Sequence, residues 1–178
     1  MAQANTKSPA ELAGVVEQTH QYLTFVLAGE VFAMGILAIK EIIEYASLTE
    51  VPMMPEYVRG VINLRGSVVP VIDLSVRFGK PASAVTKRTC IVIIEIVANG
   101  ERQVLGVVVD AVNAVLDIPS TQIEPPPAFG ASIRTDFIHG MGKVNGKFVV
   151  LLDVSHVLAA DEMSVLTEAQ QAAGAQAA

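Results

Sequence analysis

The chain has 178 residues, of which 52% are hydrophobic, 17% charged and 5% aromatic, with a formal net charge of −6 and no tryptophan. A chain of this length can bury one globular core, or two small units that share one. The negative charge and scarce aromatic residues argue against a nucleic-acid surface, which is built on basic patches and stacking rings.

The chain carries no sequence signal for a membrane or for secretion. Its longest apolar run, residues 31–39, is far shorter than the ~18 residues of a membrane-spanning helix. Residues 1–18 contain one basic residue and no apolar block, so they do not resemble a secretion signal. We therefore expect a cytoplasmic protein, with residues 1–18 and 171–178 as disordered ends.

Short apolar stretches rich in Val and Ile, separated by glycines, predict an all-β fold. Residues 22–32 form one expected hairpin, turned at Ala28-Gly29. Residues 90–109 form a second, turned at Asn99-Gly100, a pair that supplies the positive φ angles of tight turns.

Helix is expected only in short pieces. Asp73 and Asp153 each precede a possible short helix, over 73–78 and 153–158, for which the aspartate would be the N-cap. A C-terminal helix is expected over about 161–170.

The most informative feature is an internal repeat. Three positions recur at one offset, since 140−60, 146−66 and 153−73 all equal 80; they are Gly60, Gly66 and Asp73, matched by Gly140, Gly146 and Asp153. Further upstream, Ile36, Ile39 and Ile42 match Val109, Val112 and Val115 at an offset of 73. The sequence therefore predicts two copies of one β-unit, each with about five strands, enough for a small closed barrel.

The predicted boundaries derive from this repeat. Subdomain 1 covers about 19–83 and subdomain 2 about 84–160, joined near residues 80–87. Residues shared by both copies are interpreted as structural, because two sites in different surroundings have no other common reason to keep them. The glycines would provide turn geometry, and each aspartate would cap the segment after its strand.

Residues present in one copy only are candidates for function. Arg65 stands where the second copy has Asn145, and Arg-Gly is not a preferred turn pair, so a long cation is placed at the tip. The alternative is an ordinary exposed arginine. Glu41 lies in a segment that alternates less regularly than a strand with one solvent face should, and the neighbouring apolar stripe fits either a core or an interface.

Two further features leave alternatives open. Pro125, Pro126 and Pro127 form a stiff extended segment that would hold Phe129 outward, unless Phe129 folds back onto a barrel. Six basic residues against one acid occur from Arg59 to Arg88, which indicates either a solvated face or a surface for an acidic partner.

No catalytic, metal or cofactor site is predicted. Asp73 and Asp153 resemble the paired carboxylates of aspartic proteases in their symmetry, but neither is followed by the turn that exposes such carboxylates. The three histidines are scattered, and no serine lies in a nucleophile elbow. The lone Cys90 lies in an apolar run, where a thiol packs as a small, inert hydrophobe.

Over residues 21–166 the chain resembles the CheW-like chemotaxis coupling proteins. The resemblance rests on Val61-Ile62-Asn63-Leu64-Arg65-Gly66, on Val69-Pro70-Val71-Ile72-Asp73-Leu74, on Pro52 and Pro55, and on Gly106-Val107-Val108-Val109-Asp110. It implies two five-stranded SH3-like barrels packed on a shared core. It also implies a non-catalytic adaptor that joins the cytoplasmic tip of chemoreceptors to the regulatory domain of the histidine kinase CheA.

The resemblance also implies which residues bind each partner. Ile36, Ile39, Glu41, Ile42 and Phe129 match kinase-binding positions. Gly60 and Arg65 match the receptor-binding region, with Cys90 and Ile91 lining a groove between the barrels. The chain departs from the family pattern at Ala33, Met34 and Gly35, where Gly-Ile-Asp is common. The alternative is the same scaffold in a receptor–kinase pathway other than chemotaxis.

Overall fold

The computed structural model describes residues 18–98, 100–126, 137–156, 168 and 171. Its strands are β1 (Thr19–Leu27), β2 (Glu30–Gly35), β3 (Ile39–Glu44), β4 (Val58–Leu64), β5 (Ser67–Asp73), β6 (Cys90–Ala98), β7 (Glu101–Val109), β8 (Ala111–Pro119), β9 (Ile123–Glu124), β10 (Ile138–Val144) and β11 (Lys147–Leu152). The helical segments among these residues include the α-helix α2 (Leu74–Arg77) and the 3-10 turns η1 (Ile36–Ala38) and η2 (Ser120–Gln122). The predicted all-β class is confirmed.

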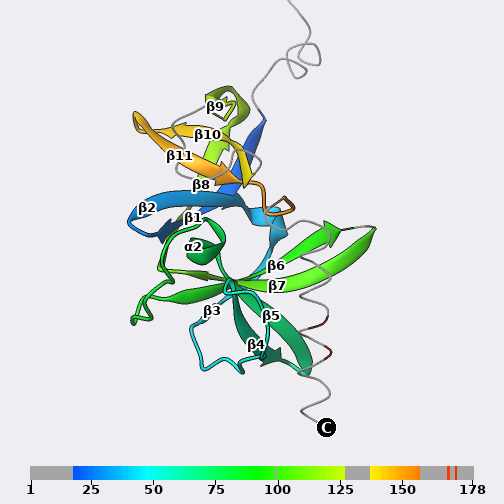
Figure 1. Cartoon of the computed structure of the whole chain (residues 1–178). Helices are drawn as coiled ribbons and strands as arrows, with labels where there is room; N and C mark the ends of the chain where they lie inside the picture. The colour runs from blue at the N-terminus through cyan, green and yellow to red at the C-terminus, as the bar shows by residue number, and fades with distance from the viewer. Residues whose placement is uncertain (1–17, 99, 127–136, 157–167, 169–170, 172–178) are drawn as a thin grey trace, which may run out of the picture.

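The strands form two sheets that lie one above the other, with α2 between them (Figure 1). One sheet has the order β8-β1-β2-β11-β10-β9 and the other β3-β6-β7-β5-β4. Each sheet combines strands from both sequence repeats, since β3 pairs with β6 and β8 pairs with β1. The division near residue 83 thus separates the repeats in the sequence but does not separate the sheets. The β1–β2 hairpin of the first repeat lies in the sheet of β8 to β11, and the β6–β7 hairpin of the second repeat lies in the sheet of β3, β4 and β5.

The hairpins predicted from the turn residues are confirmed. β1 pairs with β2 around Ala28 and Gly29, and β6 pairs with β7 from Cys90↔Val109 to the turn. The repeat is also confirmed in three dimensions. The β4–β5 and β10–β11 hairpins have equivalent registers, because Val58↔Ile72 and Ile138↔Leu152 differ by 80 in both strands.

A chain of aromatic side chains fills the space where the two sheets meet. Phe25 and Phe32 have ring centroids 6.2 Å apart, and Phe78, just after α2, lies 5.9 Å from Phe32 and 5.6 Å from Phe137. The guanidinium of Arg77 lies over the Phe137 ring at 4.9 Å. Burial of these large apolar rings holds the sheets together, and α2 forms the joint.

Gly60 and Gly140, one pair of repeated glycines, are structural for a reason beyond turn geometry. A Cβ on Gly60 would lie 2.4 Å from the Thr49 carbonyl oxygen, and one on Gly140 would lie 3.0 Å from the Glu124 carbonyl oxygen. In each repeat another backbone segment therefore packs closely against the first strand of a hairpin. The segment at Thr49 packs against β4, and β9 packs against β10. Gly60 also has a φ of 149°, which side chains disfavour.

We predict that Gly60→Ala lowers the free energy of unfolding by about 1–3 kcal/mol, through backbone strain and displacement of Thr49. Gly29→Ala is the matched control, since Gly29 has a positive φ but nothing within 4 Å of an added Cβ, so it should cost only about 1 kcal/mol. Hydrogen exchange should accelerate at the amides of Thr49 and Val61, which bond each other's carbonyls, in Gly60→Ala alone. Equal losses in both variants would contradict the crowding argument.

Asp73 caps a short helix as predicted, whereas the described residues after Asp153 form a turn in place of the predicted helix. Asp73 is fully buried and accepts hydrogen bonds from the Ser75 and Val76 N–H groups at the start of α2. Asp153 accepts from the Ser155 N–H at 3.2 Å, and a turn follows it at residues 154–156. The rest of the predicted 153–158 helix, residues 1–17 and most of the C-terminal helix and tail lie outside the described residues.

Candidate functional site

The four described residues predicted to bind a kinase come from one short stretch but do not share one face. Ile36 in η1 and Ile39 at the start of β3 are partly buried and pack against the main core. Along β3, an edge strand of the five-stranded sheet, Glu41 is partly buried while Ile42 is 42% exposed. The alternation of a strand therefore separates Glu41 from Ile42.

Glu41 and Arg65 form a bidentate ion pair. The two guanidinium nitrogens of Arg65 donate to the two Glu41 carboxylate oxygens at 3.1 and 2.7 Å. The Arg65 side chain is 77% exposed, and the hydrogen bond with Glu41, followed by the charge of Glu41, raises the pKa of Arg65 above its usual value. Residues assigned from sequence to different partners thus lie in direct contact.

This ion pair joins the two edges of the five-stranded sheet. Glu41 lies on β3 at one edge, and Arg65 is the first residue of the turn between β4 and β5 at the other. Arg65 has a φ of 51°, which an arginine adopts only at a cost, so the turn places a cation here at the expense of local strain. The pair lies at the rim of a cavity of about 680 Å³, which Val69, Ile93 and Val104 line.

The predicted receptor-binding residues are not all on the surface. Gly60 is buried beneath the segment containing Thr49. Ile91 is fully buried, which leaves its side chain no surface for direct contact in this structure. Cys90 is partly exposed, and burial together with the charge of Glu44 raises the pKa of its thiol. Arg65 is therefore the one residue of this predicted set with a largely exposed side chain.

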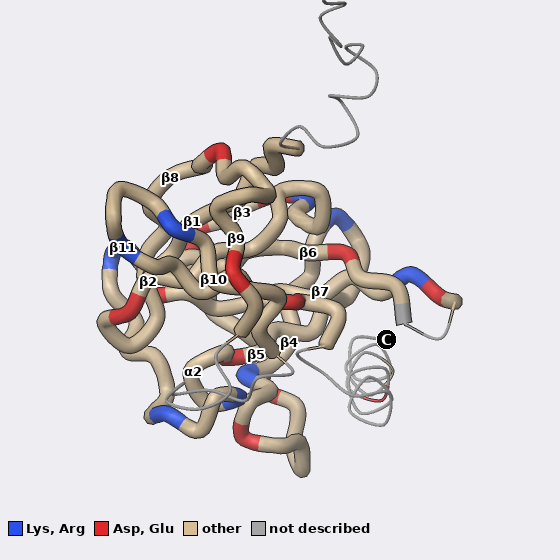
Figure 2. Tube along the Cα trace, turned by 90° about the horizontal axis from the view of Figure 1, so that it is seen from above, with Lys and Arg blue, Asp and Glu red and all other residues tan. Residues whose placement is uncertain are grey.

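Most of the basic residues between Arg59 and Arg88 are engaged within the chain. Arg59 donates to the Ser83 carbonyl at 2.8 Å, Arg77 lies over Phe137, and Lys80 pairs with Glu30 at 3.3 Å. Acidic and basic residues are interspersed along the described chain (Figure 2). These contacts favour the interpretation of the basic cluster as part of a mixed, solvated surface.

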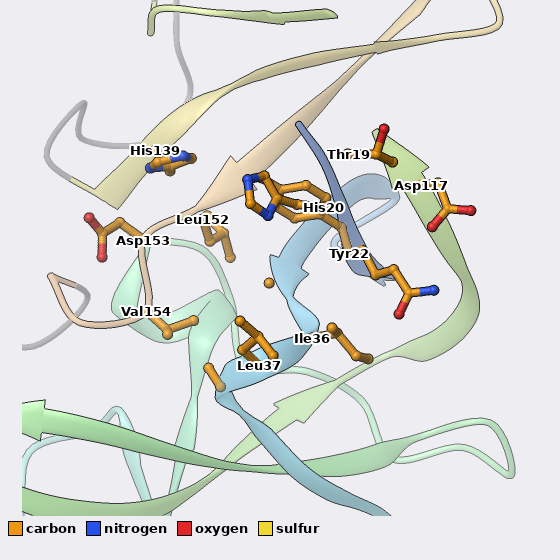
Figure 3. A pocket seen from close by; sticks show the side chains of 13 residues that line it. Thr19, His20, Tyr22, Ile36, Leu37, Asp117, His139, Leu152, Asp153 and Val154 are labelled. Atoms are coloured by element: carbon orange, nitrogen blue, oxygen red, sulfur yellow. The ribbon is translucent and has the colours of Figure 1, made fainter. Parts of the chain in front are cut away.

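A second cavity, of about 780 Å³, lies between η1 and the ends of strands of the six-stranded sheet (Figure 3). The residues that line it include His20, Ile36, Leu37, Asp117, His139 and Asp153. Leu37 is 96% exposed, an unusual position for a leucine between two partly buried neighbours. Leu37 was not predicted as a site residue from the sequence. The one indication was that the apolar run of residues 31–39 continues beyond the end of β2 at Gly35.

Asp153 is ionised in this cavity at neutral pH. Burial raises the pKa of its carboxyl, but hydrogen bonds from Ser155 and His156 and the charge of His156 lower it, and the net shift is downward. Within the described ranges no cluster of His, Cys, Asp and Glu could hold a metal ion, and no helix there is long and apolar enough to cross a membrane. Phe129 lies outside the described residues.

Comparisons with known proteins agree on one family. Residues 21–162 match the model of the CheW-like domain. The chain is 32% identical over 146 residues to a chemotaxis protein CheW of Klebsiella aerogenes, covering 82% of this chain and 86% of that protein. It is 34% identical over 145 residues to a chemotaxis protein CheW of Helicobacter pylori, covering 82% and 85%. The crystal structure of the scaffolding protein TtCheW from Thermoanaerobacter tengcongensis superposes with a TM-score of 0.73 and 31% identity, covering 92% of this chain and 99% of that one.

Proposed function

The chain belongs to the CheW family, and from this premise we propose that it couples methyl-accepting chemoreceptors to the histidine kinase CheA and brings kinase autophosphorylation under receptor control. The observation that carries the proposal is the direct contact between Glu41 and Arg65, which match the family's positions for the two partners. Proteins of this family are scaffolds and adaptors, so the prediction of a non-catalytic function is confirmed.

The kinase surface is proposed to comprise Ile36, Ile39, Glu41 and Ile42, and so to extend over both faces of the edge strand β3, with Phe129 as a further contact. The receptor surface is proposed to centre on Arg65. Gly60 and Ile91 would support it from beneath by packing, and Cys90 would lie at its border. A stable interface needs roughly 800 Å² per partner, so surfaces centred on β3 and on the β4–β5 turn would abut and share the ion pair.

An exposed ion pair can couple the two interfaces because it is easily rearranged. Such pairs contribute little to folding, so a partner can replace one side without unfolding the chain. A receptor group that takes Arg65 would leave the Glu41 carboxylate free to bind a different donor. Coupling of this kind is a free energy between two sites, typically about 1–3 kcal/mol.

The finer architecture and location form part of the same proposal. Each sheet would close into an SH3-like barrel, with the Glu41–Arg65 pair linking the edges of the five-stranded one. The protein would reside in the cytoplasm and be recruited to receptor arrays at the membrane. The second candidate function is the same scaffold in another receptor–kinase pathway, which the departure from the common family pattern at the partly exposed Gly35 favours; the neighbouring departures, Ala33 and Met34, are fully buried.

We predict that Ile36→Asp weakens binding to the kinase regulatory domain at least about tenfold, because a charge replaces apolar surface in the interface. Glu41→Lys, on the adjoining strand, should also weaken binding and does not alter the core. Val97→Asp, an exposed position at the end of β6, is the matched control and should bind normally. Titration calorimetry measures all three, and unchanged affinity in both test variants would remove this surface from the kinase interface.

A further inference from the structure

The internal repeat gives the molecule two equivalent grooves, and among the described residues only the first groove is filled by the chain itself. An offset of 80 relates Arg59 to His139 and Asp73 to Asp153, and the hairpins that carry them have the same register. The backbone confirms the equivalence, since the N–H of Asp73 donates to the Tyr57 carbonyl and that of Asp153 to the Phe137 carbonyl, again 80 residues apart.

In the first repeat, the chain's own segment after α2 fills the groove. The Ser83 N–H donates to the Asp73 carboxylate at 3.0 Å, and its hydroxyl does so at 3.3 Å. The Ser83 carbonyl accepts from Arg59 at 2.8 Å. The Asp73 carboxylate and the Arg59 guanidinium thus bind the backbone N–H, the hydroxyl and the backbone carbonyl of a single residue.

In the second repeat, the corresponding groups line the open cavity of about 780 Å³ (Figure 3). Asp153 supplies the carboxylate, and His139, the residue equivalent to Arg59, supplies an imidazole to the lining. A carboxylate has acceptor sites for about four hydrogen bonds, so Asp153 retains capacity beyond its bonds with Ser155 and His156.

We propose that this cavity binds an extended, basic segment of a protein partner, in the way that the first repeat binds its own residues around Ser83. A backbone N–H or hydroxyl of the segment donates to Asp153, and a carbonyl accepts from the His139 ring. A lysine or arginine of the segment pairs with Asp117, and an apolar side chain covers Leu37.

Charge and position favour this occupant. The described lining of the cavity holds two acidic residues, Asp117 and Asp153, and neither lysine nor arginine. Residues 79–89, the segment that contains Ser83, carry three cations and no acid. Ile36 lines the cavity, so the cavity continues the proposed kinase surface, and the inference rests on the proposed function to the extent that the segment belongs to the kinase.

The probe is a capped peptide with the sequence of residues 79–89, titrated into the full-length protein and followed by amide chemical shifts. We expect saturable binding on the order of 1 mM, because ordering a short peptide is costly, with shifts at Leu37, Asp117, His139 and Leu152. Asp117→Lys should weaken binding roughly three- to tenfold through loss of attraction and added repulsion. Glu56→Lys, an exposed acid in the segment before β4, is the matched control.

Shifts confined to other surfaces, or equal affinity in Asp117→Lys and Glu56→Lys, would overturn the proposal. Shifts of the same amides that depend on protein concentration without peptide would also overturn it, since a second copy would then occupy the groove. The peptide contains no kinase or receptor, so its failure to bind would leave adaptor activity untouched. A protein that binds the peptide but does not couple a cognate receptor to the kinase would instead contradict the proposed function and leave the proposed peptide site standing.

Discussion

Asp73→Ala is expected to lower the free energy of unfolding by about 3–5 kcal/mol, the cost of removing one partner from a buried charge pair. The Asp73 carboxylate is fully buried and lies 3.6 Å from the Arg59 Nε. It also accepts from Ser83 and caps α2, so its loss leaves several buried donors unsatisfied. Urea denaturation followed by far-ultraviolet circular dichroism measures the change.

The repeat supplies the matched control, Asp153→Ala. Asp153 is the equivalent residue, but its described hydrogen bonds are to Ser155 and His156, close in sequence and partly exposed. We expect a loss of about 1 kcal/mol, as for an ordinary N-cap. If Asp73→Ala fails to fold, Asp73→Asn keeps the cap without the charge and should lose less. Equal losses at the two aspartates would contradict the account of the buried network.

Arg65→Glu is expected to reduce receptor-dependent activation of the kinase by about tenfold or more, within the range of allosteric coupling energies. The substitution places two carboxylates where a bidentate ion pair stood, and it removes the exposed cation of the proposed receptor surface. The midpoint of thermal unfolding should change little, because the Arg65 side chain is largely exposed. A large loss of thermal stability would contradict the surface assignment.

Two further variants separate direct binding from a structural role. Lys147→Glu makes the same change of charge beside the equivalent turn of the second repeat and should leave activation intact. The exchange Glu41→Arg with Arg65→Glu restores an ion pair with reversed polarity. If partners read each charge directly, the exchange does not restore activation. Recovery of activation in the exchange variant would show that the ion pair acts only by holding the two edges of the sheet together.

The sequence predicted the features that depend on local chemistry. Turn residues located the hairpins at Ala28-Gly29 and Asn99-Gly100, and the repeat of 80 residues identified Gly60 and Asp73 as structural. The reason for Gly60 was incomplete, because the crossing of Thr49 over that strand is a tertiary contact. The sequence alone does not show that Thr49 and Gly60 lie in contact in the folded chain.

The features that depend on pairing between distant strands were not predictable. The exchange that puts β3 beside β6 and β8 beside β1 leaves no local trace in a single sequence. The same limit applies to the candidate site. Glu41 and Arg65 are 24 residues apart, and only the folded sheet brings their side chains together. Leu37 was missed because it lies in an apolar run typical of a buried strand. In the structure it belongs to the 3-10 turn η1, and its side chain points to solvent.

The most direct test of the adaptor function is kinase autophosphorylation in membranes that contain the cognate receptor, measured with and without this protein. We predict a large rise on addition of the protein, and suppression of that rise by attractant, since coupling requires both partners to be engaged. Activation by the protein that attractant fails to suppress would contradict receptor control. No rise with cognate receptor and kinase would contradict the adaptor function and favour the alternative pathway.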